Sequence, residues 1–211
     1  MARPITDSSK KPSRELLLEA ATELIRTNGY TSTTVDDLCQ KAGVSKGTFF
    51  HNFISKEELA ISAANRWSEM TSGFFRSAPY HQHKDPFDRF LGYVSFRKEI
   101  LKGDLRDFTC LVGTMVQEVY SSHPEINQAC YQSIATHAEN LEADIEATKK
   151  LYAPKATWTV KSLALHTQAV LQGAFILAKA SGDVKLASES VDHLENYIRL
   201  LFNKAGLPGE K

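Results

Sequence analysis

Hydrophobic residues recur every three or four positions along almost the whole chain. Leu17, Ala21 and Leu24 form one such stripe, which Gly29 ends, and a longer stripe runs from Leu59 to Phe74. This spacing is typical of amphipathic helices, whereas the strict alternation expected of strands is no longer than chance. The pattern predicts an all-α protein with about nine helices.

Proline and glycine divide the second half of the chain into further helices. We expect these over residues 87–102, 105–121, 124–152, 156–181 and 184–205, with Pro124, Pro154 and Gly182 at the breaks. The segment 156–181 is apolar nearly all round, which indicates burial on more than one side. The first dozen residues are polar and include Arg3, Lys10 and Lys11, as expected of a flexible arm.

Two short helices near the N-terminus have the spacing of a helix-turn-helix. They are expected from Thr34 to Lys41 and from Ser45 to His51, and Gly43 lies in the turn between them. Thr34 with Asp37 is a capping signal, and serine is a favoured cap residue. A helix-turn-helix can present its second helix to the major groove of DNA. The same spacing also occurs in helical proteins that have no DNA partner.

Composition and motif content exclude several classes of function but do not identify a single one. The 211 residues carry 25 basic and 25 acidic side chains, with a charge of +2 over residues 1–56 and −2 over the remainder. Three separated cysteines argue against a disulfide framework. No apolar run reaches the length of about 20 residues that a membrane span needs, and no signal-peptide pattern is visible. Phosphate-loop, dinucleotide-binding, nucleophile-elbow and zinc-site motifs are absent. We therefore expect a cytoplasmic protein that is not an enzyme and uses no cofactor or metal.

The segment from Ser13 to Ala60 resembles the N-terminal domain of the TetR family of transcriptional regulators. The matching stretches are Leu17–Leu24, Gly29-Tyr30, Thr33–Leu38, Ala42–Phe49, and Phe53 with Ser55–Leu59. The resemblance implies that residues 1–56 form a domain that binds a double-stranded operator. The residues expected at its DNA surface are Thr34, Ser45, Lys46, Gly47, Thr48, Phe50, His51, Asn52 and Lys56.

One of these positions departs from the family pattern. Phe50 stands where the family usually has tyrosine. Phenylalanine has no hydroxyl to donate to a phosphate, so we expect an altered backbone contact and not a loss of binding.

The resemblance also implies that the remainder, residues 57–211, dimerises and binds an effector. Two-fold dimers read two half-sites about one helical turn apart. Small and apolar residues on the last two long helices are the expected dimer contacts: Ala169, Gly173, Ala174, Val191, Leu194, Ile198 and Leu201. Ligand pockets combine apolar walls with a few polar groups. The candidates for such a pocket are Trp67, Met70, Phe90, Tyr93, Cys110, Met115, Tyr131, His137, His166 and Phe175, which suggest an apolar or aromatic small molecule.

The resemblance implies a ligand-responsive homodimeric repressor that leaves a palindromic operator when its effector binds. Cys110 offers an alternative, because Asp107–Gly113 looks like a Gly-Cys-Leu-x-Gly segment of one family branch in which some members sense electrophiles or oxidants. Such a sensor needs a partly exposed thiolate near a positive group, and Lys179 is one candidate. An all-α enzyme or an adaptor without DNA binding is a less favoured alternative.

Overall fold

The protein consists of helices and their connecting turns over residues 11–204, the part of the chain that this computed structural model describes, and no strand occurs there. The all-α prediction is confirmed, with ten α-helices and one short 3₁₀ helix in place of about nine helices. Their bounds are α1 Ser13–Asn28, α2 Val35–Ala42, α3 Lys46–Asn52, α4 Lys56–Arg76, η1 Pro79–Gln82, α5 Pro86–Glu99, α6 Leu105–Phe108, α7 Leu111–Val119, α8 Pro124–Tyr152, α9 Val160–Ser181 and α10 Val184–Leu201. The expected arm, with Arg3 and Lys10, lies mostly outside the described residues.

The helix expected over 105–121 is two helices, because the backbone is extended at Thr109 and Cys110. The carbonyl of Thr109 accepts a hydrogen bond from Arg26 Nε of α1 at 2.8 Å. This bond satisfies a carbonyl that a continuous helix would have used internally. The prediction of one helix was wrong here because the partner is 83 residues away in the sequence.

Three other expected helix bounds shift. The helix α5 ends at Glu99 and α10 ends at Leu201, short of the expected bounds, and α9 begins at Val160 with Thr159 as its cap. The stripe expected on α4 also changes direction, since Phe74 is exposed while the adjacent Phe75 is buried.

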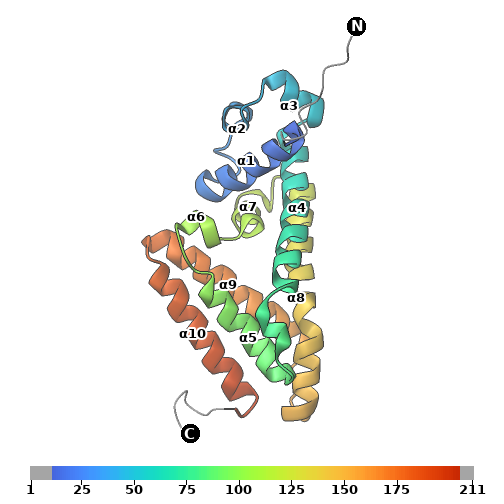
Figure 1. Ribbon diagram of the computed structural model, residues 1–211, viewed down its shortest axis with the longest axis vertical. Coiled ribbons are helices and arrows are strands. Elements are labelled where there is room, and N and C mark those ends of the chain that lie inside the picture. Colours follow the sequence, from blue (N-terminus) through green and yellow to red (C-terminus); the bar gives the residue numbers. More distant parts are fainter. Residues whose placement is uncertain (1–10, 205–211) are drawn as a thin grey trace.

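The helices form an elongated molecule with two ends (Figure 1). Helices α1–α3 make the upper end, and α5, α9 and α10 make the lower body together with the lower parts of α4 and α8. Helix α4 runs from the upper end into the body, with α8 beside it. None of the described helices combines the length and the apolarity that crossing a bilayer requires.

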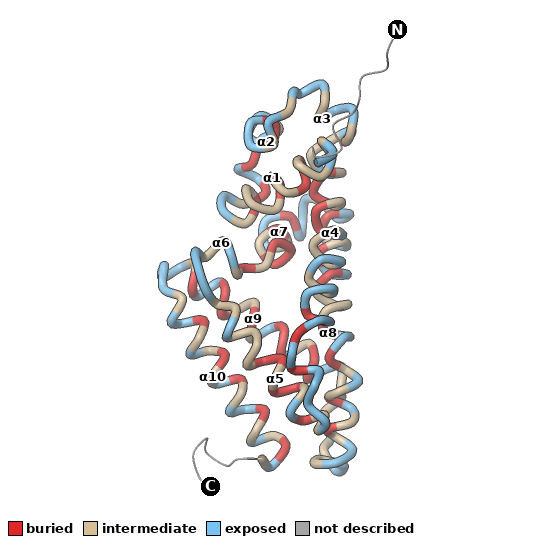
Figure 2. Tube along the Cα trace, viewed as in Figure 1, coloured by how far each residue is buried: buried red, intermediate tan, exposed pale blue. Residues whose placement is uncertain are grey.

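Two large hydrophobic cores and a small third cluster of alanines between α9 and α10 hold these parts together, and buried positions are red in Figure 2. The upper core joins α1–α3 to the first half of α4, to α7 and to the beginning of α8. The lower core joins α5, α8, α9 and α10. Leu59 and Ala63 of α4 belong to the upper core although they follow residue 56. The upper end therefore packs directly on helices of the remainder.

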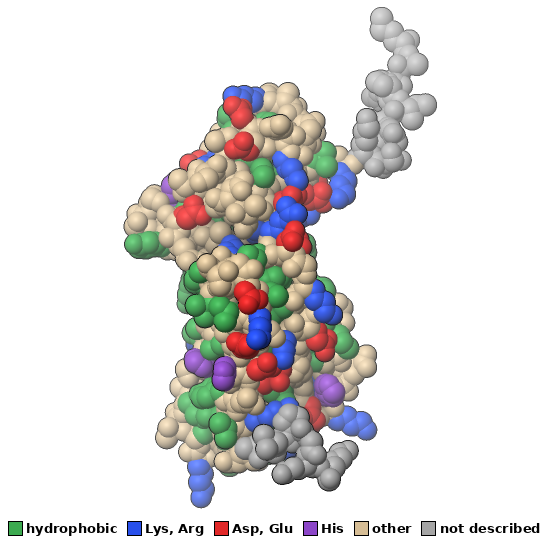
Figure 3. All heavy atoms as spheres, turned by 90° about the vertical axis from the view of Figure 1, so that its left-hand side faces the viewer, with side chains coloured by type: hydrophobic (Ala, Val, Ile, Leu, Met, Phe, Trp, Pro, Cys, Tyr) green, Lys and Arg blue, Asp and Glu red, His purple; other side chains and the backbone are tan. Residues whose placement is uncertain are grey.

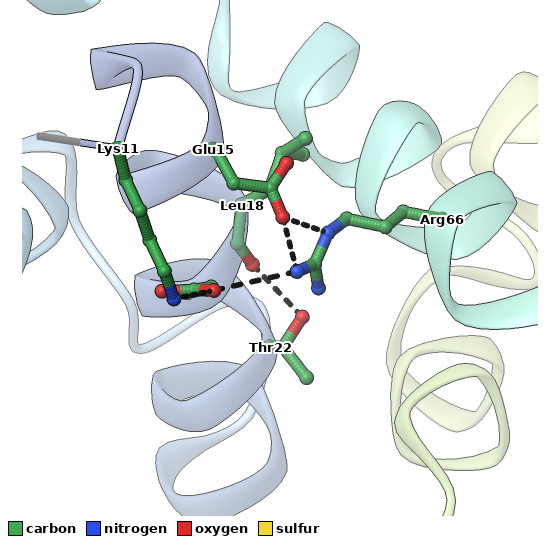
Figure 4. A network of polar contacts seen from close by, with 6 residues as sticks. Lys11, Glu15, Leu18, Thr22 and Arg66 are labelled. Carbon is green, nitrogen blue, oxygen red and sulfur yellow. Dashed lines mark hydrogen bonds and ion pairs between the residues drawn. The ribbon is translucent and has the colours of Figure 1, made fainter. Parts of the chain in front are cut away.

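Polar contacts strengthen the joint between α1 and α4 (Figure 4). Arg66 of α4 donates from Nε to Glu15 Oε1 at 2.8 Å and lies 3.5 Å from Glu19, which also pairs with Lys11. Just after the C-terminal end of α1, the backbone amides of Tyr30 and Thr31 donate to the carboxylate of Glu118. These contacts restrict motion of the upper end relative to α4 and α7.

Candidate nucleic-acid interface and effector cavity

Local signals fix the helix-turn-helix formed by α2 and α3. Thr34 caps α2 in a complete capping box, because its hydroxyl accepts from the Asp37 amide and Asp37 accepts from the Thr34 amide. Gly43 ends the helix at φ +66°, in the left-handed region that glycine adopts without strain. Ser45 then caps α3 by accepting from the Thr48 amide at 3.1 Å. Both predicted caps are confirmed.

Helix α3 has one buried face and one exposed polar face. Phe49 is fully buried in the upper core, where its ring contacts Phe53. Lys46, Gly47 and His51 are exposed on the outside. A Cβ atom at Gly47 would meet only the Ser45 hydroxyl, at 3.7 Å, so a large partner can approach the backbone closely here. This face has the size and polarity for a groove-binding helix.

Most of the residues expected to contact DNA lie on or beside this face, but several already have partners. Lys46 Nζ lies 2.7 Å from Asp36, which raises the pKa of the lysine through the hydrogen bond and the opposite charge. Asn52 donates to the Thr48 carbonyl and is half-buried. Phe50 is 55% exposed, with its ring edge against Phe49.

Lys56 is the predicted residue whose surroundings differ most from a phosphate contact. Its ammonium donates to the carbonyls of Tyr30 and Thr33, both at 3.1 Å, and lies 4.2 Å from the Tyr30 ring centroid. These contacts bind the start of α4 to the turn before α2, which is a structural role.

Ile54 is an exposed residue at this end that sequence reasoning missed. It is 84% exposed just after α3, and its amide donates to Glu58. Glu58 therefore binds the amide one residue before Ser55, while the Ser55 hydroxyl accepts from the Glu58 amide and caps α4. A bulky apolar residue that belongs to no helical stripe was the only available signal.

Comparisons with known proteins support the prediction of a DNA-binding domain at this end of the molecule. The family model described as "Bacterial regulatory proteins, tetR family" matches residues 17–63. Two relatives from Bacillus subtilis are the uncharacterized HTH-type transcriptional regulator YvkB, 25% identical over 62% of this chain and 68% of its own length, and the HTH-type transcriptional regulator LmrA, 27% identical over 64% and 72%. The crystal structure of a TetR transcriptional regulator from Chloroflexus aurantiacus has a TM-score of 0.77 and 22% identity, covering 88% of this chain and 93% of that one.

Residues 17–63 form a DNA-binding domain of the TetR family of transcriptional regulators. The match to the family model covers α1–α3 and the start of α4, and the structural likeness extends the shared fold to most of the chain. Helix-turn-helix DNA binding is thereby assigned to the upper end of this regulator.

The lower body of the regulator contains two small cavities that meet at His137 of α8. The smaller, about 50 Å³, lies between α4, α5, the α6–α7 segment, α8 and α9. The larger, about 170 Å³, lies between α4, η1, α5 and α8. The Tyr93 hydroxyl lies 3.0 Å from His137 Nε2 and accepts from Gln168 Nε2 at 3.0 Å. This chain of two buried groups, Tyr93 and Gln168, and the half-buried His137 separates the two cavities.

The charge state of His137 follows from its burial. Desolvation, together with the charge of the nearby Arg97 guanidinium, lowers the pKa of His137 to about 3. The imidazole is therefore neutral at physiological pH and can accept or donate a hydrogen bond without carrying charge.

The structure brings together about half of the expected pocket residues. Trp67, Cys110, His137 and Phe175 line the smaller cavity, and Phe90, Tyr93 and His137 line the larger one. The other candidates lie elsewhere: Met115 is fully buried in the upper core, while Met70, Tyr131 and His166 are exposed. The helical period alone could not distinguish these positions. Sequence reasoning also missed Arg97, one helical turn after Tyr93, which lines the smaller cavity.

The expected dimer residues also divide into two groups. Val191, Leu194 and Ile198 lie in the lower core of the subunit and are at most 2% exposed, so they have no surface to offer a partner. Ala174 is buried, Leu201 is half-buried against the lower core, and only Ala169 and Gly173 face outward. The exposed apolar side chains of α9 and α10 lie on the faces of these helices that are turned away from the lower core: Ile176, Leu177, Leu186, Tyr197 and Leu200.

Proposed function

We propose that this regulator is a homodimeric repressor that binds an operator through α3 and releases it when a small molecule enters the cavities beside His137. The observation that carries the ligand response is the position of the smaller cavity. Phe108, Cys110 and Val112 of its wall belong to the α6–α7 segment, whose Thr109 carbonyl binds Arg26 of α1. A ligand that displaces this segment would therefore act on the DNA-binding end.

The proposed coupling is a shift between two populations of the dimer. One population has its two α3 helices spaced for the half-sites of the operator, and the effector binds the other population more tightly. The fully buried Thr109 lies between the cavity and α1, and it allows little independent movement of either. The mechanism needs only a small displacement, because both cores are close-packed.

We place the dimer contact on the outward face of α9 and α10, defined by His166, Ala169, Gly173, Leu177, Leu186, Tyr197 and Leu200. The His166 and Tyr197 rings lie 5.2 Å apart, so the outward faces of the two helices adjoin. Figure 3, which views the molecule from the side of α10, shows hydrophobic side chains gathered along the lower body. Two such helix pairs can pack as a four-helix bundle between subunits.

A cavity-filling variant tests the ligand response. Ser72→Leu adds bulk at the wall of the larger cavity, whereas the adjacent Gly73→Leu has open space for its side chain. Operator DNA is first selected from random sequences, and compounds are then screened for release of the wild-type complex. We expect Ser72→Leu to bind the operator normally and to resist release, and Gly73→Leu to behave as the wild type. Equal release of both variants would contradict the cavity as the effector site.

The surroundings of Cys110 support a second candidate function, a thiol-based sensor. Cys110 is half-buried at the smaller cavity, and the charges of Arg26 and Lys179 act on it. Lys179 Nζ donates to Thr114 Oγ1 at 2.7 Å, and Thr114 Oγ1 donates to the Cys110 carbonyl. Cys130 is fully buried, and burial raises its pKa to about 12.

Thiol reagents distinguish this second function from the first. If Cys110 is the sensor, a thiol-modifying reagent releases wild-type protein from DNA and leaves the Cys110→Ser complex intact, while Cys130→Ser behaves as the wild type. An equal response of the Cys110→Ser and wild-type complexes would contradict the sensor.

A further inference from the structure

Arg97 of α5 is a cation without a protein counter-ion at the wall of the smaller cavity. Its guanidinium lies 5.0 Å from the Phe75 ring centroid and 5.4 Å from that of Phe175. Within residues 11–204, no carboxylate forms an ion pair with Arg97, and no hydrogen bond from its side chain is formed. Stacking on aromatic faces leaves the donors at the edge of the guanidinium free to bind a ligand.

Neighbouring cations of the same helix do have partners. Arg89 lies 2.7 Å from Asp144 and also donates to the carbonyls of His83 and Lys84. Lys98, the residue after Arg97, pairs with Asp192. A half-buried charge without a partner is costly to maintain. The contrast therefore indicates that the partner of Arg97 is not part of this chain.

The remaining wall of the smaller cavity favours an anion with an apolar body. No aspartate or glutamate lines it, and its polar side chains include the amides of Gln168 and Gln172. Trp67, Ile134 and Phe175 supply apolar surface. The charge of Arg97 already lowers the pKa of His137, which shows that its positive field reaches the polar chain between the cavities.

We propose that the effector is a small organic acid whose carboxylate binds the Arg97 guanidinium and whose aromatic or short aliphatic body fills the cavities beside His137. The planar fork of arginine matches a carboxylate with two parallel hydrogen bonds, and one arginine balances one negative charge. This proposal names the ligand class of the proposed effector site and therefore rests on the ligand response argued above. The cavity volumes limit the body to a size of one or two rings unless His137 turns aside.

Matched acids and amides test the proposal by direct binding, without DNA. The probes are benzoate with benzamide, 2-naphthoate with 2-naphthamide, and octanoate with octanamide, titrated calorimetrically into the full-length protein. We expect the wild type to bind at least one acid about tenfold or more tightly than its amide. In Arg97→Gln the affinity for that acid should fall to that for the amide.

A matched variant and a conservative variant keep the test decisive. Arg199→Gln removes the same group from α10, at a position that lines neither cavity, and acid preference should survive there. Arg97→Lys retains the positive charge but not the planar fork of the guanidinium, and it should keep part of the preference for the acid. Its affinities therefore test the proposal even if Arg97→Gln does not fold. No acid preference in the wild type, or an undiminished preference in Arg97→Gln, would overturn the proposal.

A failure of the anion-site proposal can be distinguished from a failure of the proposed function. Acid binding that depends on Arg97 but never changes operator affinity would support the anion site and contradict the ligand response. Release of DNA by uncharged compounds alone, with equal potency in Arg97→Gln, would support the ligand response and contradict the anion site.

Discussion

The two ends of the molecule differ in whether their polar side chains are exposed or enclosed. On α3 the polar groups are exposed around Gly47, where the backbone is open to a large partner. In the lower body, Tyr93, His137 and Gln168 are enclosed and bind one another. The upper end is thus suited to a macromolecule that brings its own surface, and the lower end to a small ligand that replaces internal contacts. The α6–α7 segment touches both ends.

Of the variants considered, Gly47→Leu should have the largest effect on operator binding by the upper end. Its Cβ meets only the Ser45 hydroxyl, at ordinary van der Waals distance, so folding should be unaffected, but the added bulk should keep α3 out of the groove. We expect operator selectivity to be lost, a decrease of about 10³-fold or more, with an unchanged thermal midpoint. Gly73→Leu on α4 is the control, because its Cβ meets no neighbour. Normal operator binding by Gly47→Leu would argue against α3 as the reading helix.

Leu200→Glu should distinguish operator binding by a single subunit from operator binding by the dimer. Leu200 is 65% exposed on the proposed dimer face, so a charge there should leave the subunit folded and prevent association. We expect a monomer in sedimentation experiments and about a 10²-fold loss of operator affinity, since the two half-sites are no longer linked. Leu151→Glu, at a leucine 63% exposed on α8, should remain a dimer. A dimeric Leu200→Glu protein would place the interface elsewhere.

The enclosed histidine should make the lower end sensitive to acid. Because the pKa of His137 is about 3 in the folded protein and near 6.5 when unfolded, the unfolded chain binds the extra proton. Its contribution to stability therefore falls as the pH drops from about 6.5 towards 3. Between pH 7 and pH 5 the loss should be about 2 kcal/mol.

Urea unfolding of the wild type and His137→Gln at both pH values measures this loss. The pH dependence should be smaller in His137→Gln by that amount, since glutamine preserves a hydrogen-bond partner for Tyr93 but does not titrate. An equal pH dependence of the two proteins would show that His137 is not held neutral by burial.

Lys46→Ala should give the smallest effect at the upper end. Its ammonium pairs with Asp36 in the free protein, so part of any phosphate contact replaces an existing interaction. We expect a severalfold loss of operator affinity and a decrease of about 1 in the salt slope for each subunit. The affinity measured at several salt concentrations gives both values. An unaltered affinity and slope would argue against a phosphate contact at Lys46.

Local chemistry explains why the helix-turn-helix could be predicted. The caps at Thr34 and Ser45 and the turn at Gly43 depend on residues within four positions of one another. The two-helix motif and the all-α class therefore followed from the sequence, with bounds within one residue for α2 and α3.

The features that sequence reasoning missed depend on contacts between distant residues. The break at Thr109 needs Arg26, and the isolation of Arg97 is visible only when α4, α5 and α9 surround it. Helix α10 is apolar on two sides, so its periodicity could not show that Val191 packs inward while Leu200 faces outward. Periodicity predicts a helix but does not choose between two apolar faces.

The central claim is that ligand and DNA are bound at opposite ends and are coupled through the protein. The most direct test measures the affinity of the wild-type regulator for a selected operator across a salt series, with and without a saturating acid from the matched pairs. The account predicts selective binding that falls steeply with salt and is weakened by the acid at every salt concentration, but not by its amide. Absence of salt-dependent binding to any DNA, or an operator affinity that no bound ligand changes, would contradict it.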